Sequence, residues 1–258
     1  MPRYLILCTV FLFHSVLSAE EITVAVAANF KGPMEEIKIE FQKAFKDTIV
    51  PVYGASGQLT SQIKNGAPFD LFLSADMKYP QDLFKTEFAV SSPKPYAIGI
   101  LILLGTKENK NNSDWKELLL SPEIKHIAVA NPASAPYGEA AVQALKHYGI
   151  YEALLPKIVF GESITQVNQF IFSESSDFGF TSKSALHSES FQKKQISFQI
   201  DPKSYAPILQ GVVMLKSVQG PKKNAIQNFY GFLFTKEVQN ILLKYGYELP
   251  KQPRKILD

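Results

Sequence analysis

The sequence predicts an α/β protein with two lobes, each a mostly parallel sheet flanked by helices, and a ligand cleft between them. Short apolar strands alternate with helices along the chain. A turn of small or polar residues joins a strand to the next helix at four places, and a proline-flanked segment near Pro95 separates the first two of these turns from the last two. Alternating strands and helices favour parallel sheets that are covered on both faces.

Composition is that of an ordinary globular protein, with 258 residues of which 46% are hydrophobic. The formal net charge is +3, and it falls to +2 if Arg3 is removed with the leader described next. This charge is too weak to indicate nucleic-acid binding, and the sequence has no basic run or aromatic-basic motif. No segment after the leader is apolar enough to span a membrane.

The first 19 residues are predicted to be a cleaved signal peptide. Arg3 gives a positive start, Tyr4–Phe13 forms an apolar core, and small residues up to Ala19 offer a cleavage site. The apolar core is too short to serve as a membrane anchor. Cys8 lies inside the leader, so the mature chain of about 239 residues (258 minus 19) has no cysteine and needs no disulfide in an oxidising compartment.

The mature chain begins with a strand, Ile22–Ala28, because this run is apolar and rich in β-branched residues. A helix follows, since Met34, Ile37 and Phe41 recur at spacings of three and four. Asn29 stands where that helix begins, as a cap or as a residue that faces a ligand.

The stretch Val52–Asp76 (VYGASGQLTSQIKNGAPFDLFLSAD) reads as strand, tight turn, helix, turn and strand. Gly54–Gly57 lets the backbone turn sharply, and Ser56 is placed to cap the following helix. The elements expected here are a strand at Ile49–Tyr53, a helix at Gln58–Lys64, a buried strand at Phe69–Leu73 and a helix near Met77–Phe84 that Asp76 caps.

The second half of the chain continues the alternation of apolar runs and amphipathic helices. The expected strands are Tyr96–Leu104, Ile127–Ala130, Lys157–Phe160, Asp177–Thr181 and Tyr205–Leu215. The expected helices are Trp115–Leu120, Glu139–His147, Ile164–Phe172, Ala225–Phe234 and Lys236–Tyr245. This order predicts a first lobe from residues 20–96 and 206–250, a second lobe from residues 97–205 and a loose tail at 251–258.

Four strand-to-helix turns could form one binding site, because ligands of α/β sheets lie beyond the carboxyl ends of the strands. The turns are Ala28-Asn29, Ala55-Ser56, Ala135-Pro136-Tyr137 and Ser163-Ile164. Helix N-termini carry partial positive charge and unpaired N–H groups, so four of them together favour an anion. Helix capping is the better explanation of any single turn, and the recurrence of all four is what favours the anion site.

Enzyme alternatives find little support. Gly54-Ala55-Ser56-Gly57 departs from the nucleophile elbow, because Gln58 stands where that pattern needs glycine. His126, His147 and His187 lie in no motif, and no metal-ligand spacing occurs. We therefore expect no catalytic residues, no metal site of the usual kind and no cofactor.

Several segments resemble the periplasmic molybdate-binding proteins of ABC uptake systems. They are Val24–Met34 (VAVAANFKGPM), Gly54–Asp76, Tyr96–Ile100, Asn131–Gly138 (NPASAPYG), Asp177–Phe180 and Tyr245–Pro250, which span nearly the whole mature chain in order. The resemblance implies a type II solute-binding protein that holds tetrahedral molybdate or tungstate between its lobes.

Carried over residue by residue, the resemblance implies that Ala28, Asn29, Ser56, Tyr137 and Ile164 bind the oxyanion, Ile164 through its backbone N–H. The same five residues are the metal site if molybdate is counted as a metal ligand. Two departures weaken the match: alanine replaces hydroxyl residues that are common in the family at positions 28 and 55.

The resemblance further implies an exported, periplasmic monomer that delivers its anion to the membrane permease and ATPase of an ABC transporter, without nucleic acid or a membrane span of its own. Two alternatives remain open. One is a binding protein for sulfate, phosphate or a small carboxylate, and the other is a secreted hydrolase with Ser56 as the nucleophile.

Overall fold

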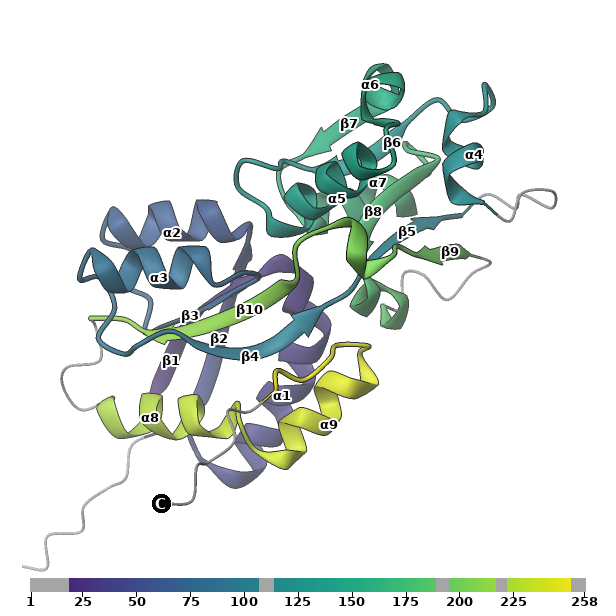
Figure 1. The fold of residues 1–258 in the computed structure, drawn as a ribbon. Coiled ribbons are helices and arrows are strands. Elements are labelled where there is room, and N and C mark those ends of the chain that lie inside the picture. Colours follow the sequence, from purple (N-terminus) through teal and green to yellow (C-terminus); the bar gives the residue numbers. More distant parts are fainter. Residues whose placement is uncertain (1–18, 107–113, 189–194, 217–221, 252–258) are drawn as a thin grey trace, which may run out of the picture.

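Two five-stranded sheets organise the protein, which is represented by a computed structural model describing residues 19–106, 114–188, 195–216 and 222–251 (Figure 1). The first sheet has the order β2-β1-β3-β10-β4, built from β1 (Glu21–Ala27), β2 (Thr48–Gly54), β3 (Leu71–Ser74), β4 (Lys94–Gly99) and β10 (Ile208–Met214). The second has the order β7-β6-β8-β5-β9, built from β5 (Leu101–Gly105), β6 (Ile127–Ala130), β7 (Ile158–Gly161), β8 (Phe178–Ser182) and β9 (Ile196–Gln199). We call each sheet with its helices a lobe.

The two-lobed α/β fold predicted from the sequence is confirmed, but the sheets are mixed rather than mostly parallel. In the first lobe β1 pairs in parallel with β2 and β3, whereas β10 is antiparallel to both β3 and β4. In the second lobe β6 is parallel to β7 and β8, whereas β5 is antiparallel to β8 and β9. The antiparallel strands β5 and β10 are those that enter each sheet from the other lobe.

Helices cover both sheets (Figure 1). The α-helices are α1 (Lys31–Ala44), α2 (Ser56–Lys64), α3 (Lys78–Lys85), α4 (Trp115–Leu120), α5 (Pro136–His147), α6 (Tyr151–Leu154), α7 (Ile164–Phe172), α8 (Lys223–Phe232) and α9 (Lys236–Lys244). Short 3-10 turns are η1 (Ala28–Phe30), η2 (Leu155–Lys157), η3 (Lys183–His187) and η5 (Pro202–Ser204). The bounds predicted for α4, β6 and α7 are confirmed, whereas β9 and the 3-10 turns were missed.

One expected strand is in fact two. The run Tyr96–Leu104 was predicted as a single strand, but β4 ends at Gly99 in the first sheet and β5 begins at Leu101 in the second. Continuous hydrophobicity hides the break because both strands are buried. The first sheet therefore extends beyond residue 96, where the sequence placed the lobe boundary, and the chain crosses between sheets at Ile100.

The first sheet buries both of its faces, as alternation along β1 requires. Val24 and Val26 belong to a core cluster with α1, α8 and α9, whereas Ala25 belongs to a cluster with α2 and α3. A separate, larger cluster fills the second lobe and reaches the residues between the lobes. Packing on both faces thereby fixes the position at which each strand ends and the chain turns into the next helix.

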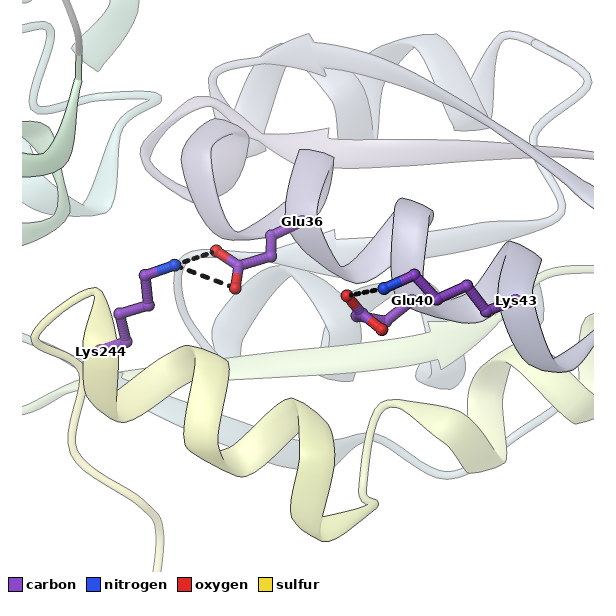
Figure 2. A network of polar contacts seen from close by, with 4 residues as sticks. All are labelled: Glu36, Glu40, Lys43 and Lys244. Atoms are coloured by element: carbon purple, nitrogen blue, oxygen red, sulfur yellow. Dashed lines mark hydrogen bonds and ion pairs between the residues drawn. The ribbon is translucent and has the colours of Figure 1, made fainter.

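Figure 2 shows charged contacts on the outer surface of α1. Lys244 of α9 lies 2.8 Å from a carboxylate oxygen of Glu36, and Lys43 lies 2.7 Å from Glu40 within α1. The Glu36 carboxylate raises the pKa of the Lys244 ammonium. Both pairs are at least partly exposed to solvent and are screened by salt, so neither adds much stability, and only the Lys244–Glu36 pair joins α9 to α1.

Within the described ranges, none of the helices combines the length and the hydrophobicity that crossing a membrane requires. The predicted signal peptide lies almost entirely in residues 1–18, and the predicted tail lies mostly in residues 252–258. Both predictions therefore fall outside the described residues.

Candidate functional site

A small cavity lies between the lobes, where the four predicted strand-to-helix turns meet. It is lined by Ala27, Ala28, Asn29, Gly54, Ala55, Ser56, Ala75, Ala135, Pro136, Tyr137 and Ile164. All five predicted site residues are in this set. The cavity measures about 10 Å³, which is roughly the space that one water needs, so lobes at this separation must part slightly to admit a polyatomic ligand.

The first turn follows β1, where η1 begins at Ala28 and runs into α1. The prediction that Asn29 caps the helix or faces a ligand is wrong in its first part, because neither η1 nor α1 has a side-chain cap. The Asn29 side-chain amide instead donates to Gln210 Oε1 at 3.1 Å and to Tyr247 Oη at 3.0 Å. Both amide hydrogens are thus used away from the cavity, which leaves the backbone N–H as the group that Asn29 can offer.

The second turn corrects the role of Ser56. Ala55 is the N-cap residue and α2 begins at Ser56, which makes no side-chain cap bond. The Ser56 hydroxyl oxygen instead accepts from the backbone N–H of Ala75 at 3.0 Å. Since a hydroxyl that accepts one bond still has its own proton, Ser56 can donate from both its hydroxyl and its backbone N–H.

The third turn places Tyr137 in the first turn of α5, which begins three residues earlier than predicted because Pro136 is suited to the first helical position. The phenol oxygen of Tyr137 accepts from Gln210 Nε2 at 3.3 Å. Burial raises the pKa of Tyr137 well above its usual value, so the phenol stays neutral. Gly138 is needed here, because a Cβ at that position would stand 1.9 Å from the Ala130 carbonyl oxygen.

The fourth turn follows β7, and α7 begins at Ile164 as predicted. Ser163 is a helix cap, since its hydroxyl accepts from the backbone N–H of Gln166 at 3.5 Å. The Ile164 N–H lies in the first helical turn, where backbone donors have no partner within the helix. The Ser163 side chain therefore caps α7, and Ile164 is the residue of this turn that lines the cavity.

The cavity wall contains neutral groups only. Its lining has no lysine, arginine, histidine or carboxylate, and its one phenol is held neutral by burial. The first turns of η1, α2, α5 and α7 supply N–H groups and the positive ends of their dipoles. Such a wall can bind a small anion, but it offers no base for the hydrolase alternative in which Ser56 would be a nucleophile.

Sequence reasoning missed the polar residues behind the cavity. Gln210 is fully buried in the middle of β10, and Tyr96, Tyr247 and Ser184 are buried beside it. Tyr96 Oη donates to Gln210 Oε1 at 3.0 Å. One signal was present in the sequence, since Gln210 interrupts an otherwise apolar strand (YAPILQGVVML).

On another side of the cavity the loop after β6 touches the start of α2. The Gly57 N–H donates to the Ser134 carbonyl oxygen at 2.9 Å. The Tyr79 hydroxyl donates to the Ala133 carbonyl oxygen at 3.2 Å. The two lobes are thus in direct contact beside the cavity as well as behind it.

Comparison with known proteins is consistent with this geometry. The family described as "Bacterial extracellular solute-binding protein" matches residues 22–248. The molybdate-binding protein ModA of Rhodobacter capsulatus is 37% identical over 231 residues, which are 89% of this chain and 89% of that protein. These matches confirm the resemblance that the sequence motifs indicated.

Two solved structures share the fold. The periplasmic molybdate-binding protein of Azotobacter vinelandii has a TM-score of 0.83 at 30% identity, and the match covers 89% of this chain and all of that one. The sulfate-binding protein SubI from Mycobacterium tuberculosis H37Rv has a TM-score of 0.76 at 15% identity, covering 90% and 88% of the two chains. At that identity the second match speaks for the fold alone.

Proposed function

Because the chain belongs to the family of bacterial extracellular solute-binding proteins, which bind solutes and are not enzymes, we propose that it captures molybdate or tungstate between its lobes for an ABC transporter. The observation that carries the proposal is the meeting of four helix N-termini, two from each lobe, at one small cavity with neutral walls. The molybdate-binding relatives in two other bacteria support the choice of anion.

In the proposed binding mode the anion receives hydrogen bonds from both lobes. The first lobe offers the backbone N–H groups of Ala28, Asn29 and Ser56 together with the Ser56 hydroxyl. The second lobe offers the backbone N–H groups of Tyr137 and Ile164. A tetrahedral oxyanion has acceptor oxygens in several directions, which suits donors that point inward from separate helices.

Neutral donors also suit a protein that must release its ligand. A buried ion pair would bring a large desolvation cost and would be hard to separate, whereas hydrogen bonds from helix N-termini can be exchanged for water as the lobes open. Alanine methyl groups at Ala27, Ala28, Ala55, Ala75 and Ala135 limit the space around the donors. Selection would then depend on the size and the protonation state of the anion.

Ligand capture is proposed to proceed by hinge closure of the two lobes. The hinge would lie where the chain crosses between the sheets, at Ile100 and between Ile200 and Ile208. The lobes would then comprise residues 20–99 with 208–250 and residues 101–200, close to the division that the sequence predicted. A monomer is sufficient, because both halves of the site come from one chain.

Export and delivery complete the proposal. A signal peptide that is cleaved near Ala19 would release the mature chain into the periplasm, and a membrane permease with its ATPase would receive the anion. The extracellular solute-binding family and the periplasmic relative support this location. The cysteine-free mature sequence is compatible with an oxidising compartment.

The test is ligand-dependent stability of the purified mature protein, supported by titration calorimetry. Molybdate and tungstate should raise the melting temperature, because a ligand at 1,000 times its Kd stabilises the native state by about 4 kcal/mol. Sulfate and phosphate at the same concentration should raise it little. A larger rise in melting temperature with sulfate than with molybdate would show that sulfate is the preferred ligand. No rise with any oxyanion would refute anion binding.

A further inference from the structure

A buried polar network lies behind the cavity and crosses between the lobes twice. Its first-lobe members are Asn29, Gln210 and Tyr247, and its second-lobe members are Ser184 and Tyr137. Each of these residues is at most 7% exposed. None of them is charged, so the network depends on hydrogen bonds alone.

The first crossing joins Ser184 to Asn29. The Ser184 hydroxyl donates to the Asn29 carbonyl oxygen at 2.8 Å, and the Tyr247 hydroxyl lies 2.8 Å from the same oxygen and 3.2 Å from Ser184 Oγ. Ser184 belongs to η3 in the second lobe, whereas Asn29 and Tyr247 belong to the first. Opening of the lobes must break the bond between Ser184 and Asn29.

The second crossing joins Gln210 to Tyr137. The Gln210 side chain accepts from Asn29 Nδ2 at 3.1 Å through its oxygen and donates to Tyr137 Oη at 3.3 Å through its nitrogen. The Gln210 side-chain amide therefore makes hydrogen bonds to Asn29 of its own lobe and to Tyr137 of the second lobe at the same time. Both residues also line the cavity, where they offer backbone N–H groups.

We propose that Ser184 and Gln210 are positioning residues that latch the closed lobes, without touching the oxyanion. Neither residue lines the cavity, and each makes a buried hydrogen bond to a residue that does. These bonds exist only when the lobes are together, so they stabilise the closed state and leave the open state unchanged. This inference rests on the proposed function, because it assumes that closure accompanies binding of the anion.

The latch predicts an effect on release rather than on capture. A neutral hydrogen bond that is lost on opening corresponds to about a two- to tenfold change in an equilibrium constant. Ser184→Ala should therefore raise the molybdate dissociation rate by about two- to tenfold and leave the association rate within about twofold. Stopped-flow kinetics with the mature protein would measure both rates.

Thr181→Val is the matched control. Thr181 is a fully buried hydroxyl residue three positions before Ser184, and it donates to Asn168 at 2.6 Å within the same lobe. Its loss should alter stability but not the dissociation rate. Equal dissociation rates in Ser184→Ala and the wild type, or an equal increase in Thr181→Val, would overturn the latch.

A second measurement does not need the ligand. Spin labels on Lys85→Cys in α3 and Lys146→Cys in α5 would report the distance between the lobes, because both positions are exposed and the mature chain has no other cysteine. In the ligand-free protein, Ser184→Ala and Tyr137→Phe should each lower the closed fraction. Tyr137→Phe removes the acceptor of Gln210 and keeps the backbone donor.

The two measurements separate this inference from the proposed function. If the wild type binds no oxyanion, the proposed function fails, and the latch is judged by the distances between the labels alone. A closed fraction that is lower in both variants than in the wild type would support it. Unchanged distance distributions in both variants would refute it.

Discussion

Replacing Gly57 by alanine should hinder closure of the lobes while leaving every proposed ligand donor in place. Gly57 is the second residue of α2, and its N–H donates to the Ser134 carbonyl oxygen of the second lobe at 2.9 Å. A Cβ on Gly57 would stand 2.7 Å from Tyr79 Oη, 3.0 Å from Ser134 Cα and 3.1 Å from Ser134 Cβ. Gly57→Ala therefore pushes the loop of the second lobe away from α2.

The expected loss of affinity follows from these contacts. The Tyr79 hydroxyl can move aside, but the Ser134 backbone can move only with its loop or its lobe. Overpacking of this kind costs about 1–3 kcal/mol, which corresponds to a rise in Kd of about five- to 150-fold. Since the strain against Ser134 arises only when the lobes meet, and the Tyr79 hydroxyl within the first lobe can move aside, the substitution weakens closure and not the folding of either lobe.

The folded but open protein should respond in the opposite direction. Alanine is a better helix former than glycine by up to about 1 kcal/mol, so the melting temperature without ligand should stay the same or rise. Calorimetric titration with molybdate and thermal unfolding without it would be measured on one preparation. Gly231→Ala is the control, because Gly231 lies in α8 and a Cβ there would meet nothing within 4 Å.

Two results would refute the reasoning. A Kd for Gly57→Ala within twofold of the wild type would show that the contact with Ser134 does not limit closure. A melting temperature that falls together with affinity would show that the substitution damages the first lobe itself. Gly231→Ala should keep the wild-type Kd in either case.

Three further predictions concern the cavity and the residues behind it. Ser56→Ala should weaken molybdate binding by about 1–3 kcal/mol in calorimetry, because a buried acceptor oxygen loses its donor; an unchanged Kd would remove the hydroxyl from the site. Ile164→Pro should weaken binding by a similar amount while α7 persists in circular dichroism, since proline is tolerated at the first helical position but has no N–H; full affinity would exclude that donor. Burial raises the pKa of Tyr247 to about 12, so the folded protein keeps a proton that the unfolded chain loses near pH 10. The free energy of unfolding should then be unaffected by Tyr247 below pH 10 and fall by up to about 3 kcal/mol between pH 10 and 12, and chemical denaturation of Tyr247→Phe should show a smaller fall.

The order of the elements and the four site turns could be predicted from the sequence, because both depend on local chemistry. An apolar run followed by small residues and an amphipathic helix specifies a strand-to-helix turn within about 15 residues. Ile164 illustrates this, since the helix was predicted to begin there and does so, with Ser163 as its cap. Parallel pairing of β1 with β2 and β3 then brings the first two turns to one edge of their sheet.

The direction of the crossing strands could not be predicted in the same way. The residues of β4 and β5 form one apolar run, and nothing in its pattern shows that the chain changes sheets at Ile100. The hydrophobicity of a segment shows that it is buried but not in which direction it pairs. β5 and β10 pair in the antiparallel direction because each enters its sheet from the other lobe. The two chain crossings between the lobes, and not the strand sequences, therefore make both sheets mixed.

Only the tertiary structure decided what the polar side chains of the site do. The Ser56 hydroxyl does not cap α2 but accepts a hydrogen bond from the N–H of Ala75, 19 positions away. Asn29 is joined to Gln210 and Tyr247 across 181 and 218 positions. A capping pattern is local and visible in the sequence, whereas partners at such separations are set by the folding of both lobes. The sequence by itself determined where the candidate site lies and that its possible donors are neutral, and the packing of the lobes determined which side chains remain free to face a ligand.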